Sequence, residues 1–259
     1  MTVGLRPGSV ILALSLLHGA LAVPAGAAER SLAERLSARG IRDQRVIAAF
    51  DAVPRDLFIA PDAPERAFDD RPLPAGYSQA ISQPQILARM IELLQLKPES
   101  RVLEVGGGTG YAAAILGRLS GEVFSVGPIP ELTTTARLRL TRSGYQNVHV
   151  KLGDGAAGWR EYAPFDAVFV TSIGSRVPPA LIEQLVESGV LVMAVGPPSG
   201  RQVLLRGVKK GFKLHAKEVG ELRGDADGRP REDRTRAGRR ESVSEERGAP
   251  RSDDSRSDR

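Results

Sequence analysis

The spacing of hydrophobic residues changes along the chain and divides it into four stretches. An apolar run from Val10 to Val23 comes first. Between residues 32 and 57 apolar positions recur at helical spacing, with Gly40 as a break between two segments. From Arg101 to about residue 222, short continuous apolar runs alternate with amphipathic segments. After residue 223 large apolar side chains are almost absent.

The alternating stretch predicts an α/β fold. Strands are expected at 102–105, 122–126, 148–151, 167–171 and 190–195, and helices at 111–119, 131–143 and 178–185. An antiparallel pair at 203–209 and 212–219 is expected to close the sheet. Because strands that alternate with helices usually pair in parallel, we expect a mostly parallel, doubly wound, Rossmann-like sheet with helices on both faces.

A helical extension is expected before this core. Residues 61–84 have a loop-like composition, rich in proline and acid, and Pro84 suits the first turn of a helix that ends near Lys97 and Pro98. The expected domain organisation is therefore a leader at 1–27, a helical and loop region at 28–100, a core at 101–222 and a disordered charged tail at 223–259. A docking role for the tail is the alternative.

The first residues have the pattern of an export signal. Arg6 supplies a positive charge, the run from Val10 to Val23 is short for a membrane span, and Ala25-Gly26-Ala27 fits the cleavage rule. We therefore expect a periplasmic or secreted monomer without stable membrane insertion after cleavage. The alternatives are an uncleaved anchor, or a misassigned start codon and a cytoplasmic protein.

Composition excludes several chemistries. The chain has no cysteine, and its three histidines, His18, His149 and His215, lack metal-ligand spacing, so no metal is expected. His149 reads as a surface strand residue. The formal net charge is +5, but the basic residues are interspersed with acids and aromatic content is 5%, so no nucleic-acid partner is expected.

The most informative segment is RVLEVGGGTG at 101–110. An apolar strand ends at Glu104 and Val105, and a glycine-rich turn then leads into an Ala-rich helix. Glycine allows a ligand to lie against bare backbone, and a helix N-terminus favours anionic or polar ligand groups. The two-residue glycine steps fit an S-adenosylmethionine loop better than a dinucleotide fingerprint. A tight turn without a ligand remains the alternative.

Several blocks together resemble the protein-L-isoaspartate O-methyltransferase family between about Leu32 and Leu222. They are VPRDLFI (53–59), DDRPLPAG (69–76), QAISQP (79–84), LEVGGGTGY (103–111), IPEL (129–132), GDG (153–155), APFDAVFVT (163–171) and VPPALIEQL (177–185). The resemblance implies a class I methyltransferase fold and S-adenosyl-L-methionine as donor. It implies that the acceptor is the α-carboxylate of isoaspartyl residues in damaged proteins or peptides, a step in protein repair.

The resemblance also assigns roles to residues. Ser82 matches the family's active-site serine, and Asp154 would accept a hydrogen bond from the adenine amino group. The residues implied in donor binding are Gln79, Ile81, Ser82, Glu104, Gly106, Gly108, Thr109, Gly110, Gly153 and Asp154. Simpler structural roles stay open: Ser82 could cap the helix that Pro84 begins, Asp154 could be a turn residue, and Glu104 could orient the loop by accepting backbone N–H groups.

The chain also departs from the family pattern. Gly127 stands where the family has an acid that holds the donor's ribose hydroxyls, and Ala80 stands where it has threonine. The usual closing strand is replaced near Val219–Leu222 by VGEL. These departures leave two alternatives to repair methylation: an exported, degenerate member that binds peptides without efficient catalysis, or a methyltransferase for another carboxylate.

Overall fold

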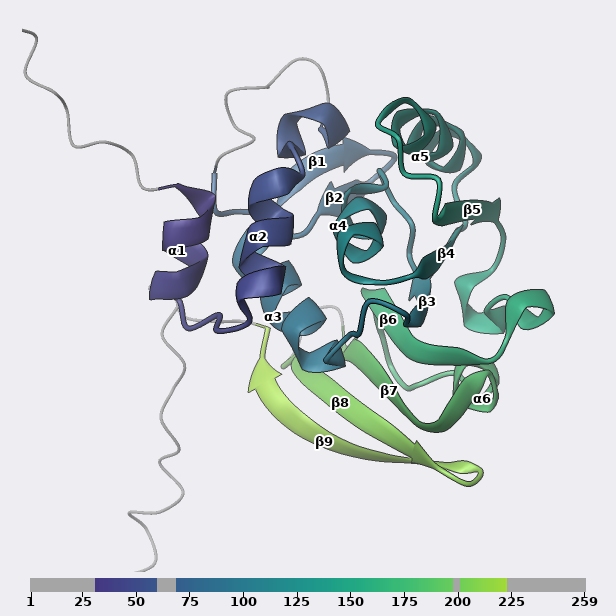
Figure 1. Cartoon of the computed structure of the whole chain (residues 1–259). Coiled ribbons are helices and arrows are strands. Elements are labelled where there is room, and N and C mark those ends of the chain that lie inside the picture. The colour runs from purple at the N-terminus through teal and green to yellow at the C-terminus, as the bar shows by residue number, and fades with distance from the viewer. Residues whose placement is uncertain (1–30, 60–68, 198–200, 223–259) are drawn as a thin grey trace, which may run out of the picture.

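The computed structural model describes residues 31–59, 69–197 and 201–222 (Figure 1). The expected leader and charged tail lie outside these residues, so both stay predictions. Within the described ranges, no helix is both long enough and apolar enough to cross a membrane.

A seven-stranded sheet forms the centre of the molecule, in the order β5-β4-β3-β6-β7-β8-β9. Its strands are β3 (Arg101–Val105), β4 (Glu122–Gly127), β5 (Val148–Leu152), β6 (Phe165–Gly174), β7 (Leu185–Val195), β8 (Val203–Lys210) and β9 (Lys213–Glu221). Strands β3 to β7 pair in parallel, and β8 and β9 complete the sheet in antiparallel pairing. The expected mostly parallel α/β sheet is confirmed.

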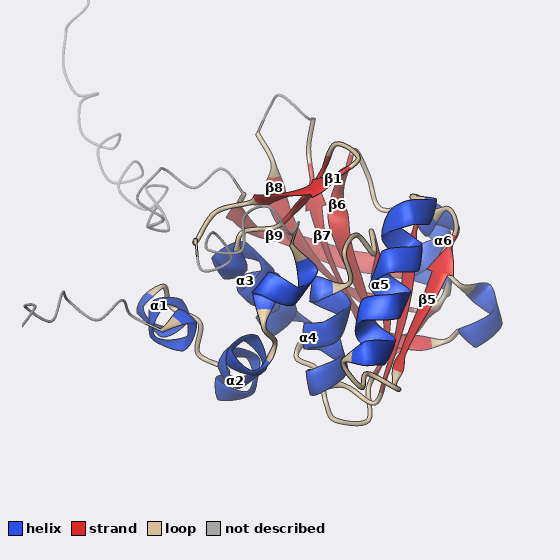
Figure 2. Ribbon diagram, turned by 90° about the horizontal axis from the view of Figure 1, so that it is seen from above, coloured by secondary structure: helices blue, strands red, loops and turns tan. Residues whose placement is uncertain are grey.

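Helices cover the sheet on both faces, because successive strand residues alternate between two cores. Val102 and Phe169 face the core under α3 (Pro84–Leu94) and α4 (Tyr111–Leu119). Leu103 and Val168 face the opposite core, which includes Leu181 of α6 (Pro179–Glu183). Helix α5 (Pro130–Arg142) packs beside β4 and β5, and Figure 2 shows α3, α4 and α5 in a row along the sheet. Short turns η3 (Gly155–Ala157) and η4 (Arg160–Tyr162) lie between β5 and β6.

The expected N-terminal helical extension is present. It consists of α1 (Leu32–Ala38), α2 (Gln44–Ala52) and the turn η1 (Arg55–Phe58). Ser31 begins α1 with a capping box, and Asp43 caps α2. Phe50 and Phe58 pack against the Tyr111 ring at 6.2 and 5.6 Å between centroids. The extension is thereby joined to the residue that follows the glycine turn.

Three predictions about elements were wrong in detail. The expected loop contains a hairpin, β1 (Leu73–Gly76) and β2 (Gln79–Ile81), whose turn residues Tyr77 and Ser78 have positive φ. Such turns usually carry glycine or asparagine, so the sequence gives no hairpin signal here. Helix α3 ends at Leu94 because Gln95 is left-handed, and α6 ends at Glu183 because Leu185 already pairs with Phe165.

Candidate functional site

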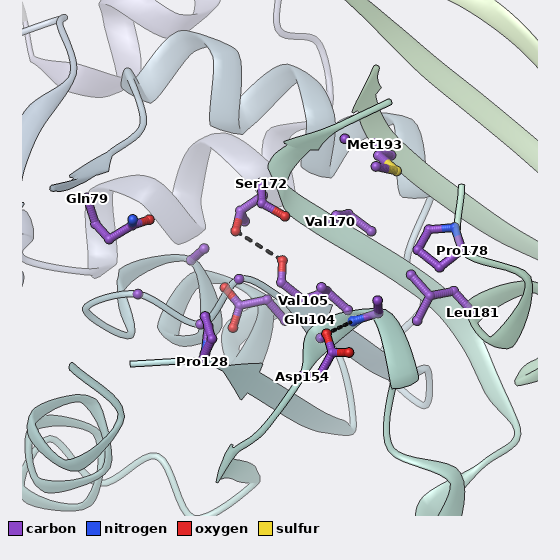
Figure 3. Close-up of a pocket in the computed structure, with 18 of the residues that line it drawn as sticks. Gln79, Glu104, Val105, Pro128, Asp154, Val170, Ser172, Pro178, Leu181 and Met193 are labelled. Carbon is purple, nitrogen blue, oxygen red and sulfur yellow. Dashed lines mark hydrogen bonds between the residues drawn. The ribbon is translucent and has the colours of Figure 1, made fainter. Parts of the chain in front are cut away.

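A cavity of about 780 Å³ lies at the carboxyl ends of β3 and β6, where parallel sheets commonly bind ligands. Its wall combines the glycine turn after β3, the hairpin strand β2, the turn after β5 and the segment from β6 to α6 (Figure 3). The predicted site residues that line it are Gln79, Ile81, Ser82, Glu104, Gly106, Gly108, Thr109 and Asp154. The structure thus brings together predicted residues from three separate sequence blocks.

The glycine turn is held close to β6. Gly106 has φ +120°, and a Cβ at this position would overlap Thr171 Oγ1. That hydroxyl donates to the Val105 carbonyl at 3.1 Å, so it is fixed against the turn. Gly108 also has positive φ, at +50°, and a Cβ there would meet little of the surrounding structure. The turn therefore presents bare backbone to the cavity.

Two predicted donor-binding residues are not on the cavity wall. Gly110 has φ +89° as the N-cap of α4, and a Cβ there would lie 3.1 Å from the Ala136 Cβ of α5. Gly153 lies beside Val126, and a Cβ at Gly153 would lie 3.6 Å from the Val126 Cγ1. Neither residue is among those that line the cavity. Gly110 instead allows close packing between α4 and α5.

Glu104 is the most unusual group in the cavity wall. The residue is 1% exposed, and within the described residues neither carboxylate oxygen has a hydrogen-bond partner. Burial raises the pKa of this carboxyl group to about 7, and the nearby Ser125 hydroxyl offsets the rise in part without making a hydrogen bond of normal geometry. The expectation that Glu104 orients the loop by accepting backbone N–H groups is therefore wrong. A cationic ligand group would satisfy this carboxylate.

Asp154 combines a turn role with a place in the cavity. Its carboxylate accepts from the Ala156 backbone N–H at 2.9 Å, which caps the turn η3. The same residue lines the cavity, and Figure 3 shows its side chain at the edge opposite Met193. The turn interpretation is confirmed, and the remaining carboxylate lone pairs leave capacity for a further donor.

Ser82 follows β2 and does not cap α3. The helix begins at Pro84, and its N-cap residue, Gln83, makes no side-chain capping bond. The Ser82 hydroxyl makes no hydrogen bond to the rest of the described chain, whereas its carbonyl accepts from Arg55 at 3.1 Å. The capping alternative is wrong, and the hydroxyl is available at the cavity wall.

Gly127 ends β4 directly before Pro128, which lines the cavity. A Cβ at Gly127 would meet the Thr133 hydroxyl at 3.3 Å and the Gly107 Cα at 3.6 Å. These distances leave room for a side chain with a small adjustment of Thr133. A lack of space for a side chain therefore does not explain why the chain has glycine at this position instead of the family's acid.

The sequence did not single out several cavity residues. Ser172, Arg176 and Met193 also line the cavity. They lie in strand ends and a loop whose composition carries no ligand signal. Among the described residues no group of His, Asp and Glu side chains could hold a metal ion. His149 lies on β5 with a 44% exposed side chain, as expected of a surface strand residue.

The mostly parallel sheet and its glycine-lined cavity define a Rossmann-like protein that binds a nucleotide-type cofactor. The family model for protein-L-isoaspartate(D-aspartate) O-methyltransferase matches residues 27–223. The chain therefore belongs to the protein-L-isoaspartate O-methyltransferase family.

Individual relatives agree with this assignment. A protein-L-isoaspartate O-methyltransferase from Opitutus terrae is 46% identical over 72% of this chain and 80% of its own length. Protein-L-isoaspartate O-methyltransferase 1 from an Anaeromyxobacter species is 50% identical over 70% of this chain and 85% of its own. A solved protein-L-isoaspartate O-methyltransferase structure superposes with a TM-score of 0.67 at 31% identity, over 74% of this chain and 63% of that longer chain.

Proposed function

We propose that the cavity binds S-adenosyl-L-methionine and that the protein methylates the α-carboxylate of L-isoaspartyl residues in damaged proteins and peptides. The observation that carries the proposal is Glu104, a buried carboxylate on the wall of a glycine-lined cavity that has no hydrogen-bond partner in the part of the chain that the structure describes. The α-ammonium group of the donor is the cation that this carboxylate lacks. Family membership supports the acceptor class.

The residues present fit such a donor. Glu104 would hold the ammonium group, and the backbone of Gly106 to Thr109 would hold the methionine end. Asp154, which still has free lone pairs, would accept from the adenine amino group. When bound, the donor supplies a methyl group activated by a sulfonium.

The protein's own contribution is alignment and exclusion of water. An isoaspartyl carboxyl group is already ionised at neutral pH, since reference values lie near 4. No side chain therefore has to remove a proton from it. The Ser82 hydroxyl is free to donate to the acceptor, and the hairpin strand β2 forms the neighbouring wall. Holding the carboxylate in line with the methyl group is catalysis by proximity.

A pair of synthetic peptides tests the acceptor. Calorimetric titration of the protein without residues 1–27 is expected to show saturable donor binding. Methyl transfer is then expected to a peptide with one isoaspartyl residue and not to its aspartyl twin, because only the former offers the displaced α-carboxylate. An absence of heat at millimolar donor, or equal transfer to both peptides, would contradict the proposal.

Gly127 favours a second candidate function, a family member that binds altered peptides but transfers methyl groups poorly. The position that would hold the ribose hydroxyls has no side chain. Peptide binding that discriminates isoaspartyl from aspartyl peptide without donor consumption would favour this candidate. Consumption of donor with other carboxylates only would instead indicate a different methyltransferase.

We also propose that the protein is exported. The support is the sequence of Arg6, the apolar run and Ala25-Gly26-Ala27. In a bacterial host that exports proteins, the full chain is expected to accumulate in the periplasm or medium with Ala28 as its first residue, as determined by mass spectrometry. A variant with Arg6 and the apolar run deleted is the control, and an intact N-terminus on cytoplasmic protein would contradict the proposal.

A further inference from the structure

Arg55 connects three points of the chain beside the cavity. It is the first residue of η1 and is 4% exposed. Its Nη1 donates to the Asp69 carbonyl at 2.8 Å, and its Nη2 donates to the carbonyls of Arg71 and Ser82, both at 3.1 Å. A planar guanidinium group with five donors can satisfy several carbonyls at once.

These carbonyls belong to both ends of the β1–β2 hairpin. Asp69 and Arg71 lie in the segment that leads into β1, and Ser82 immediately follows β2. The hydrogen bonds of Arg55 therefore close the base of the hairpin. At the other end of the hairpin, Tyr77 and Ser78 form the positive-φ turn.

The hairpin needs such support because its own pairing is short. Strand β2 has only 3 residues, and a bulge interrupts its register with β1. An isolated two-stranded hairpin is marginally stable in water. Yet the stretch from Gln79 to Ser82 forms one wall of the cavity. Its position thus depends on contacts outside the two strands.

Arg55 also lies beside a second element of the cavity wall. Its guanidinium carbon lies 5.9 Å from the centroid of the Tyr111 ring. Tyr111 lines the cavity and is the first residue of α4, directly after the glycine turn. One buried cation therefore joins the base of the hairpin to the helix that follows the donor loop.

We propose that Arg55 is a positioning residue of the methyl transfer: it holds the base of the β1–β2 hairpin so that Ser82 and β2 lie against the cavity. The inference rests on the proposed function and deepens it. Arg55 does not touch the reacting atoms. It acts through the backbone of Ser82, whose carbonyl it fixes.

The test compares Arg55→Lys with Arg139→Lys. Lysine keeps the charge but cannot reach all three carbonyls from one nitrogen. Arg139 is a matched control, since it donates to the carbonyls of Phe58 and Ile59 at 3.1 and 3.2 Å and does not line the cavity. Amide hydrogen exchange of residues 73–82 is measured in both variants, together with kcat and KM for an isoaspartyl peptide and the donor Kd.

Arg55→Lys is expected to speed exchange in the hairpin at least tenfold and to lower kcat/KM at least tenfold, with a smaller change in donor Kd. Arg139→Lys is expected to change neither hairpin exchange nor kcat/KM. Equal hairpin exchange in the two variants, or unchanged kcat/KM in Arg55→Lys, would overturn the inference. If the unmodified protein transfers no methyl group, the proposed function fails, and the exchange comparison still decides whether Arg55 holds the hairpin.

Discussion

Glu104→Gln is expected to abolish most donor binding and, at the same time, to stabilise the empty protein at alkaline pH. The carboxylate is buried and has no hydrogen-bond partner among the described residues, so only the nearby Ser125 hydroxyl offsets the cost of its burial until a cation binds. Loss of a charge-assisted hydrogen bond of about 1.5–3 kcal/mol corresponds to roughly a 10- to 100-fold weaker donor affinity. Calorimetry at pH 8 measures this loss.

The pH dependence of stability follows from the direction of the pKa shift. Burial raises the pKa of Glu104 from 4.5 to about 7, so between these values the folded protein binds more protons than the unfolded chain. The stability of the empty protein therefore falls as pH rises through this range, by about 3 kcal/mol for this group. Glutamine stays neutral, and the advantage of Glu104→Gln in denaturant unfolding is expected at pH 8 and not at pH 4.

Glu122→Gln is the control for both measurements. Glu122 lies on the neighbouring strand β4 with a 46% exposed side chain, in an ion pair with Arg101 and with His149 Nε2 at 3.6 Å. Such exposed pairs contribute at most about 1 kcal/mol. Donor affinity is expected to be unchanged by Glu122→Gln. Unaltered donor binding in Glu104→Gln would refute the role given to Glu104.

The core of the fold could be predicted because its sequence signals are local. Val102, Leu103 and Val105 give the apolar character that is typical of a buried parallel strand, and the glycines that follow mark the turn. The β1–β2 hairpin could not be predicted in this way. Its turn uses Tyr77 and Ser78, and its base is held by Arg55 from a different element. Tertiary contacts therefore decide a structure that local sequence does not encode.

The candidate site, too, could be predicted from the sequence only in part. The glycine turn, Asp154 and Ser82 were recognised from sequence blocks, and all lie on the cavity wall. The sequence could not separate Gly110, which serves helix packing, from the neighbouring glycines, because the difference lies in what each Cβ would meet. Nor could it predict that Glu104 has no hydrogen-bond partner among the described residues, which depends on the surroundings of a buried strand end.

Gly127→Asp is expected to strengthen donor binding by about 10- to 100-fold. A carboxylate at the end of β4 would accept charge-assisted hydrogen bonds from the ribose hydroxyls, each contributing about 1.5–3 kcal/mol. The position can take a side chain, because a Cβ would lie 3.3 Å from the Thr133 hydroxyl and farther from the Gly107 Cα. The donor Kd from calorimetry is the measurement.

Two further variants separate charge from shape. Gly127→Asn adds a side chain of the same size without charge, and Gly127→Ala adds only the Cβ. If the gain comes from charge-assisted bonds, the order of affinity is Asp above Asn above Ala, with Ala close to the native protein. A donor affinity in Gly127→Asp no higher than in Gly127→Ala would mean that the ribose lies elsewhere. Donor binding that appears only in Gly127→Asp would mean that the native chain has lost donor binding through this one position. That outcome would favour the peptide-binding alternative over repair methylation.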